Sequence, residues 1–140
     1  MRVVVTGAAG FIGAHTVRVL AEAGCRVYAV DRALPRAHGP AWPRGVTFHR
    51  LDVGVPAFGE LLRRLRPEAV VHLAAQARVD RSLADPEEDF SANLAVTARV
   101  ARWAVQAGCR RVVFSSSAAV YGPPAALPLR EDAPCRPVSP

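Results

Sequence analysis

Three glycines near the amino terminus have the spacing of a phosphate-binding turn. Gly7, Gly10 and Gly13 follow residues 3–6, an apolar run typical of a strand buried on both faces of a parallel sheet. Glycine lets the backbone N–H groups of such a turn approach a pyrophosphate, which then lies at the amino terminus of the following helix. The pattern predicts a dinucleotide-binding turn. The alternative is a tight strand-to-helix turn in which glycine serves close packing alone.

A carboxylate follows at the position where a dinucleotide ribose would bind. Asp31 ends the second apolar run, residues 26–30. A carboxylate there can accept both hydroxyls of the adenosine ribose and repels a 2′-phosphate, which favours NAD over NADP. Two alternatives stay open: Arg32 could accept a phosphate, and Asp31 could be a solvated carboxylate at a strand end.

Alternating strands and helices must position these residues. Helical spacing of apolar residues predicts helices after Phe11, from about Pro56 to Arg66 and from about Pro86 to Ala107. Five apolar runs predict strands at residues 3–6, 26–30, 46–49, 70–73 and 112–115, and a loop rich in proline and glycine occupies residues 32–45. This order predicts an α/β fold with a doubly wound parallel sheet of the Rossmann type, formed by one domain over residues 1–140 with a proline-rich tail from about 123 to 140.

The composition excludes several classes of function. All 18 positive side chains are arginines, and they are scattered without interleaved aromatic residues, which disfavours a nucleic-acid partner. The three cysteines lack CxxC spacing, which argues against a disulfide framework and a metal site. No apolar run is long enough to cross a bilayer, and glycines interrupt any signal-peptide core. We expect a cytoplasmic protein with no membrane partner.

Further motifs follow in a fixed order. Residues 4–13, 51–53, 72–77 and 114–122, together with Asn93, resemble the ordered motifs of extended short-chain dehydrogenase/reductases of the NAD-dependent epimerase/dehydratase family. The resemblance covers essentially the whole chain. It implies NAD as cofactor and a nucleotide sugar as substrate. The residues that it assigns to the cofactor or its support are Gly7, Gly10, Phe11, Ile12, Gly13, Asp31, Asp52, Val53, Leu73, Ala74, Ala75, Gln76, Asn93 and Ser115.

The resemblance also implies a mechanism for which this chain lacks residues. In that family a tyrosine phenolate removes a sugar hydroxyl proton while a hydride passes to the nicotinamide, and Ser117 matches the catalytic Ser/Thr. The tyrosine belongs to a YxxxK pair, but this sequence contains no lysine. Residues 135–140 resemble the stretch before that tyrosine. We therefore expect an incomplete domain, inactive alone and marginally stable or aggregation-prone, with a homodimer possible if the missing helix is supplied.

The branch of the family can be narrowed from two positions. Ala118 and Ala119 stand where the 4,6-dehydratases carry an acidic pair that expels water, which disfavours a dehydratase. Residues 72–79 resemble the 4-epimerases of UDP-sugars. The resemblance thus implies the NAD-binding portion of a UDP-glucose/UDP-galactose 4-epimerase-like enzyme. The alternatives are a catalytically dead NAD-binding or assembly module and a fragment of a related dehydratase or reductase.

Three further groups of residues have no assigned chemistry. Arg78 and Arg81 either approach the diphosphate of a substrate or lie in a solvated loop. His72 has apolar neighbours, and the two tryptophans, Trp42 and Trp103, are isolated in the sequence. Such residues more often belong to a core or an interface than to a ligand site, so we expect a structural role.

Overall fold

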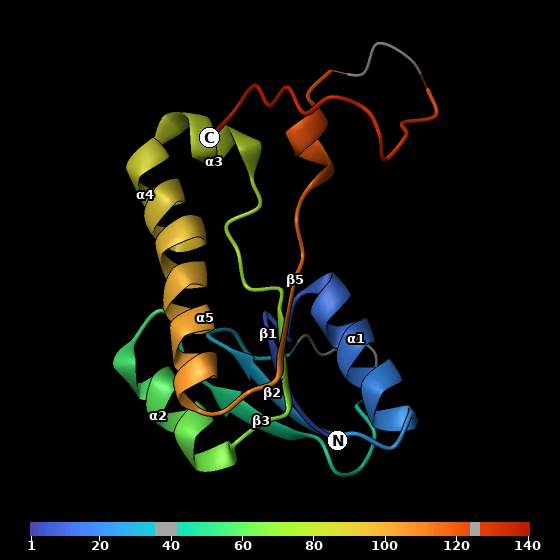
Figure 1. The fold of residues 1–140 in the computed structure, drawn as a ribbon, viewed down its shortest axis with the longest axis vertical. Coiled ribbons are helices and arrows are strands. Elements are labelled where there is room, and N and C mark those ends of the chain that lie inside the picture. The colour runs from blue at the N-terminus through green and yellow to red at the C-terminus, as the bar shows by residue number, and fades with distance from the viewer. Residues whose placement is uncertain (36–41, 124–126) are drawn as a thin grey trace.

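Five parallel strands form a single sheet in the computed structural model, which describes residues 1–35, 42–123 and 127–140 (Figure 1). The order is β3-β2-β1-β4-β5, so the direction of strand succession reverses between β1 and β4. The strands are β1 (Arg2–Thr6), β2 (Arg26–Asp31), β3 (Thr47–Arg50), β4 (Ala69–His72) and β5 (Arg111–Phe114). The predicted doubly wound parallel sheet is confirmed. Each predicted strand lies within one residue of its observed bounds.

Helices cover both faces of the sheet. Figure 1 shows α1 (Phe11–Glu22) on one face, and α2 (Pro56–Leu65) with α5 (Val96–Gln106) on the other. Strand β1 is buried on both sides: Val4 packs in the cluster that includes α2 and α5, whereas Val3 and Val5 pack in the cluster that includes α1. Alternating strand side chains thus contribute to two separate cores.

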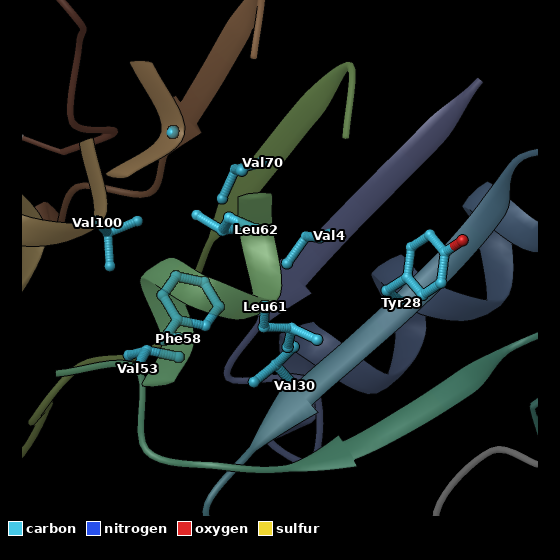
Figure 2. Packing of buried hydrophobic residues seen from close by; sticks show 10 residues of the cluster. Val4, Tyr28, Val30, Val53, Phe58, Leu61, Leu62, Val70 and Val100 are labelled. Carbon is cyan, nitrogen blue, oxygen red and sulfur yellow. The ribbon is translucent and has the colours of Figure 1, made fainter. Parts of the chain in front are cut away.

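The larger core lies between the sheet and helices α2 and α5. Phe58 and Leu62 of α2 are fully buried there, together with Val4 of β1 and Val100 of α5 (Figure 2). Both helices therefore dock on the sheet through an apolar face, as their helical spacing of leucine, phenylalanine and valine predicts. This core fixes α5 against β1 and β4.

The region between β4 and α5 differs from the sequence-based prediction. The helix expected from Pro86 to Ala107 is confirmed, since α4 (Pro86–Phe90), a π-helical segment η1 (Ser91–Ala95) and α5 follow one another without a break, but the π-helical segment within it was not predicted. A short helix, α3 (Val79–Ala84), and a 3₁₀ turn, η2 (Ala118–Tyr121), were not predicted. Short helices give too few turns for a periodic signal, and π-helical insertions have none.

The expected loop at residues 32–45 is only partly described. The structure shows no helix or strand at residues 32–35 or 42–45, in agreement with the prediction. Residues 36–41 lie outside the described part of the chain. Trp42 packs on Phe48 with ring centroids 5.6 Å apart, which confirms its structural role.

A buried histidine connects three elements at the carboxyl ends of β1 and β4. The Thr6 hydroxyl lies 2.7 Å from His72 Nδ1, and the Leu73 and Ala74 N–H groups both donate to Thr6 Oγ1 at 3.2 Å. Since Thr6 accepts two hydrogen bonds, its single hydrogen must point to Nδ1. The neutral imidazole then carries its proton on Nε2 and donates it to Thr97 Oγ1, 3.1 Å away. The structural role expected for His72 is confirmed.

Helices α2 and α5 approach each other closely at a glycine. A Cβ atom at Gly59 would lie 2.8 Å from Cδ1 of Trp103, closer than carbon atoms pack in folded proteins. The indole is itself fixed, because its ring packs edge-to-face on Phe58 with centroids 6.2 Å apart. Gly59 is therefore required by the helix–helix packing, although glycine is a poor helix former. Trp103 has the structural role expected from the sequence.

We expect Gly59→Ala to lower the free energy of unfolding by about 1–3 kcal/mol, because the added methyl group overpacks the helix interface. Urea denaturation measures the effect. In a Trp103→Leu background the clash is absent, and the same substitution should be neutral or stabilising by about 0.5–1 kcal/mol, the gain of alanine over glycine in a helix. Equal destabilisation in both backgrounds would contradict this account of the packing.

We expect the free energy of unfolding to fall as the pH drops from about 7 to about 5. Burial lowers the pKa of His72, so the unfolded chain takes up a proton near the ordinary histidine pKa while the folded chain does not. The slope for one histidine is at most about 1.4 kcal/mol per pH unit. Denaturation of His72→Gln across this pH range should show a smaller slope.

A second histidine provides the control for that measurement. Burial and the charge of Arg64 lower the pKa of His49 in the same direction. His49→Gln should therefore remove a separate share of the pH dependence and leave the share of His72. A wild-type slope in His72→Gln would show that His72 is not held neutral in the fold.

Candidate functional site

A cleft of about 390 Å³ opens at the carboxyl ends of four neighbouring strands. It lies over the point where the strand order reverses, which is where ligands bind in open α/β sheets. Each of the segments that follow β1, β2, β3 and β4 contributes to its wall. The lining residues are Gly7, Ala9, Gly10, Asp31, Arg32, Ala33, Leu34, Leu51, Asp52, Val53, Leu73, Ala74, Ala75, Ala92 and Val96.

The glycine turn allows two backbone segments to lie in contact at the floor of the cleft. Gly7 has a φ of 66°, and a Cβ atom there would lie 2.7 Å from the backbone nitrogen of Ala74. A Cβ atom at Gly13 would overlap the Gly7 carbonyl oxygen, so α1 packs directly on the turn. Both glycines are required by close approach, whatever ligand the turn binds.

The amino terminus of α1 opens at this turn without a side-chain cap. Gly10 is the N-cap, and no side chain among the described residues bonds to the helix at that position. The first helical hydrogen bond joins the Ala14 N–H to the Gly10 carbonyl at 2.9 Å. The backbone N–H groups of Phe11, Ile12 and Gly13 therefore have no acceptor within α1. These donors and the helix dipole favour an anion at this end of α1.

Asp31 is held at the cleft wall by two backbone groups. The Ala9 N–H donates to Oδ2 and the Ala33 N–H donates to Oδ1, each at 2.9 Å. The two bonds fix the plane of the carboxylate, while each oxygen keeps a lone pair that can accept a further hydrogen bond. Arg32 lies beside it on the same wall. Asp31 is thus anchored to the backbone on both oxygens and is not a carboxylate that moves freely in solvent.

The segment after β3 gives the cleft an apolar wall with one carboxylate. Asp52 accepts a hydrogen bond from the Gly54 N–H at 2.7 Å, which closes a local turn. The next residue, Val53, is buried in the larger core, and Leu51 packs against that core. A flat apolar group could lie against this wall with polar contacts at its edge.

Gln76 and Asn93 bond to each other and do not line the cleft. The Gln76 N–H donates to Asn93 Oδ1 at 2.8 Å, and Asn93 Nδ2 donates to the Gln76 carbonyl at 3.0 Å. Asn93 is in the π-helical segment η1, so the unusual backbone turns its amide toward the segment that follows β4. The pair supports the backbone next to Ala74 and Ala75 rather than presenting a side chain to a ligand.

The serine motif lies beyond the cleft. The Ser115 N–H donates to the His72 carbonyl at 3.4 Å, at the carboxyl end of β5. Ser117 is exposed and caps η2, since its Oγ accepts the Ala119 N–H at 3.1 Å. The structure therefore places Ser115 and Ser117 next to the strand ends but does not bring them into the same cavity as Asp31.

Arg78 and Arg81 are engaged with neighbouring acids. Arg78 pairs with Asp80, and Arg81 pairs with Glu88 at 3.0 Å. All four side chains are largely exposed. Of the two alternatives open at the sequence level, the structure favours a solvated surface.

Sequence reasoning missed several residues that line the cleft. Ala9, Ala33 and Leu51 are direct neighbours of predicted residues, and the predicted turn and strand ends could have identified them. Leu34, Ala92 and Val96 carry no chemical signal and enter the wall only through the tertiary arrangement.

The described residues contain neither a cluster of metal ligands nor a helix that could cross a membrane. No group of three histidine, cysteine or acidic residues within residues 1–35, 42–123 and 127–140 could hold a metal ion. Within the same ranges, no helix has the length and apolar content needed to cross a membrane.

The sequence is similar to those of several UDP-glucose 4-epimerases. The UDP-glucose 4-epimerase of Mycolicibacterium smegmatis is 42% identical over 145 residues, which cover 100% of this chain and 46% of that protein. The UDP-glucose 4-epimerase of Azospirillum brasilense is 37% identical over 140 residues, which cover 99% of this chain and 40% of that protein. The chain thus spans less than half the length of these relatives.

The fold is similar to solved structures of UDP-glucose 4-epimerases. A Thermus thermophilus UDP-glucose 4-epimerase in complex with NAD superposes with a TM-score of 0.85 at 39% identity, covering 99% of this chain and 45% of that one. A Stenotrophomonas maltophila UDP-glucose 4-epimerase with bound NAD and formylated UDP-arabinopyranose superposes with a TM-score of 0.86 at 30% identity, covering 99% and 44%.

The family comparison covers nearly the whole chain. The model of the NAD dependent epimerase/dehydratase family matches residues 3–140. That range contains the glycine turn, the Asp31 wall and the serine motif. The chain therefore belongs to the NAD dependent epimerase/dehydratase family.

Proposed function

We propose that this chain binds NAD in the cleft at the carboxyl ends of β1 to β4 and forms the cofactor-binding portion of a UDP-sugar 4-epimerase. One observation carries the proposal: the uncapped amino terminus of α1 and the fixed Asp31 carboxylate face the same cleft. The first suits a pyrophosphate and the second suits a ribose, and a dinucleotide contains both.

The residues present fit each part of the cofactor's adenosine diphosphate half. Gly7 and Gly10, with the N–H groups at the start of α1, would hold the pyrophosphate. Asp31 would accept the ribose hydroxyls. The wall formed by Asp52 and Val53 would receive the adenine. When bound, NAD supplies a reversible hydride acceptor, which is the chemistry that epimerisation through a 4-keto sugar requires.

The segment after β4 would support the rest of the cofactor. Leu73, Ala74 and Ala75 line the cleft, and the small alanine side chains let a ring lie close to the backbone. Thr6 fixes this backbone through its hydroxyl, as the hydrogen bonds to Leu73 and Ala74 show. Asn93 fixes its far end at Gln76.

The choice between NAD and NADP depends on two neighbouring side chains. The Asp31 carboxylate would repel a 2′-phosphate, whereas Arg32 on the same wall could attract one. We favour NAD because two backbone N–H groups hold the Asp31 carboxylate in place at the wall. Among the described residues, no hydrogen bond or ion pair holds the Arg32 side chain, and only its carbonyl accepts one, from Arg50 at 3.2 Å. The NAD complexes of two structural neighbours support the same choice.

The substrate side of the proposal rests on Ser117 and on the relatives. Ser117 stands beyond the cleft at the end of β5, where it would bond to the sugar hydroxyl that loses its proton. The names of the relatives support a UDP-sugar as substrate. The proposal further includes a cytoplasmic location and a homodimer formed when the helix that follows β5 in such enzymes is supplied.

A second candidate is an NAD-binding or assembly module without catalysis. These 140 residues contain no lysine and therefore no YxxxK pair, so the chain taken by itself has a cofactor site without the family's catalytic base. The two candidates share the same cofactor site and differ in whether further residues complete it.

We expect calorimetry of the 140-residue chain to show NAD binding. Asp31→Asn should raise the Kd for NAD about tenfold, because it removes one charge-assisted hydrogen bond, which contributes about 1.4 kcal/mol. The same variant should lose part of its discrimination against NADP, because the repelling charge is removed. Asp132→Asn removes the same charge at an exposed residue away from the cleft and should bind as the wild type does. Equal NAD affinity in all three proteins would contradict the assignment of Asp31.

We expect the chain by itself not to interconvert UDP-galactose and UDP-glucose, because no tyrosine–lysine pair is present to remove the sugar proton. A coupled assay for UDP-glucose, with an intact epimerase as positive control, measures this. Turnover by the purified chain would show that another base replaces the pair.

A further inference from the structure

A carboxylate is buried beside the cofactor cleft without an ion pair. Asp89 in α4 is only 7% exposed, and it is the one acidic residue in the buried class among those that the structure describes. None of the salt bridges found in the described ranges includes it. A buried carboxylate costs free energy unless hydrogen bonds compensate, so the groups that surround it indicate what it does.

The Asp89 side chain accepts hydrogen bonds from two side-chain amides. Gln76 Nε2 donates to Asp89 Oδ1 at 3.1 Å, and Asn93 Nδ2 donates to the same oxygen at 3.2 Å. A carboxylate has acceptors only, so it forces the NH₂ group of each amide to face it. The carbonyl oxygen of each amide must then face away.

These two orientations determine how the backbone after β4 is held. With its nitrogen toward Asp89, Asn93 places Oδ1 on the Gln76 N–H at 2.8 Å, and its nitrogen also reaches the Gln76 carbonyl. Gln76 in turn places Oε1 on the Arg78 N–H at 2.7 Å. If the Asn93 amide were reversed, its NH₂ group would face the Gln76 N–H, and its oxygen would face the Gln76 carbonyl. Neither pair can form a hydrogen bond.

This clamp acts on the same segment that lines the cleft. Leu73 and Ala74 are fixed at one end by Thr6, and Gln76 is fixed at the other by Asn93. Ala75 lies between the two anchors and lines the cleft. The π-helical turn at η1 brings Asn93 into position, and π-helical insertions are frequent at functional sites.

We propose that Asp89 is a positioning residue for cofactor binding: its carboxylate anchors the amide nitrogens of both Gln76 and Asn93, and these side chains hold residues 73–76 in the shape that the NAD cleft requires. The proposal rests on the proposed function. It assigns to Asp89 no contact with the cofactor, since Asp89 does not line the cleft.

Asp89→Ala tests the proposal with two readouts on the 140-residue chain. Hydrogen exchange of the Gln76 N–H, measured without ligand, should accelerate about tenfold relative to the wild type, because the Asn93 side chain loses the acceptor that anchors its nitrogen and holds Gln76 less firmly. The Kd for NAD should rise about tenfold. Glu87→Ala removes the same charge from the exposed face of the same helix and should change neither readout.

Asp89→Asn separates orientation from charge. No hydrogen bond to Asp89 Oδ2 is found among the described residues, so an asparagine can keep its oxygen at the Oδ1 position and place its nitrogen where no donor opposes it. We expect this variant to remain within about threefold of the wild type in both readouts. If Asp89→Ala does not fold, Asp89→Ser replaces it, because a serine hydroxyl is too short to reach both amides.

The results decide the two proposals separately. Folded Asp89→Ala or Asp89→Ser with wild-type exchange at Gln76 and wild-type NAD affinity would overturn the role of Asp89, as would an Asp89→Asn variant as impaired as the alanine variant. A wild-type chain that does not bind NAD would overturn the proposed function, and the exchange of Gln76 would still show whether Asp89 orients the clamp.

Discussion

The close contact between the glycine turn after β1 and the segment after β4 is the constraint on which the rest of the structure depends. Gly7 lies against the backbone of Leu73 and Ala74, so no side chain fits between the two segments. Thr6 bonds to the same two N–H groups, and His72 fixes the Thr6 hydroxyl from below. The strand order reverses at this contact, and the cleft opens directly above it.

Two further hydrogen bonds hold the segments around the cleft in place. Asp31 is tied to the glycine turn through the Ala9 N–H, which joins the end of β2 to the end of β1. Asn93 ties the segment after β4 to the helical layer. Each functional group is thus positioned by backbone hydrogen bonds, which are less adaptable than contacts between exposed side chains. A dinucleotide would meet a cleft that is already formed.

The fold and half of the site could be predicted from the sequence because their signals are local. Buried parallel strands appear as apolar runs, and the requirement for glycine at Gly7 and Gly13 and for a carboxylate at Asp31 follows from the chemistry of the turn. The π-helical turn, α3 and the burial of Asp89 could not be predicted. They depend on which residues meet across the tertiary structure, and Asp89 resembles its exposed neighbours Glu87 and Glu88 in the sequence.

Strand β5 differs from β1 in burial, because Val113 and Phe114 are about half exposed. The marginal stability expected from an uncovered edge strand stays a prediction.

A crystal structure of the chain grown with NAD tests the central claim most directly. The account predicts the pyrophosphate at the amino terminus of α1, the adenosine ribose on the Asp31 carboxylate and the adenine against the wall formed by Asp52 and Val53. The hydrogen bonds that the Leu73 and Ala74 N–H groups donate to Thr6 should be unchanged by the ligand. NAD bound elsewhere, or an empty cleft at a saturating NAD concentration confirmed by calorimetry, would contradict it.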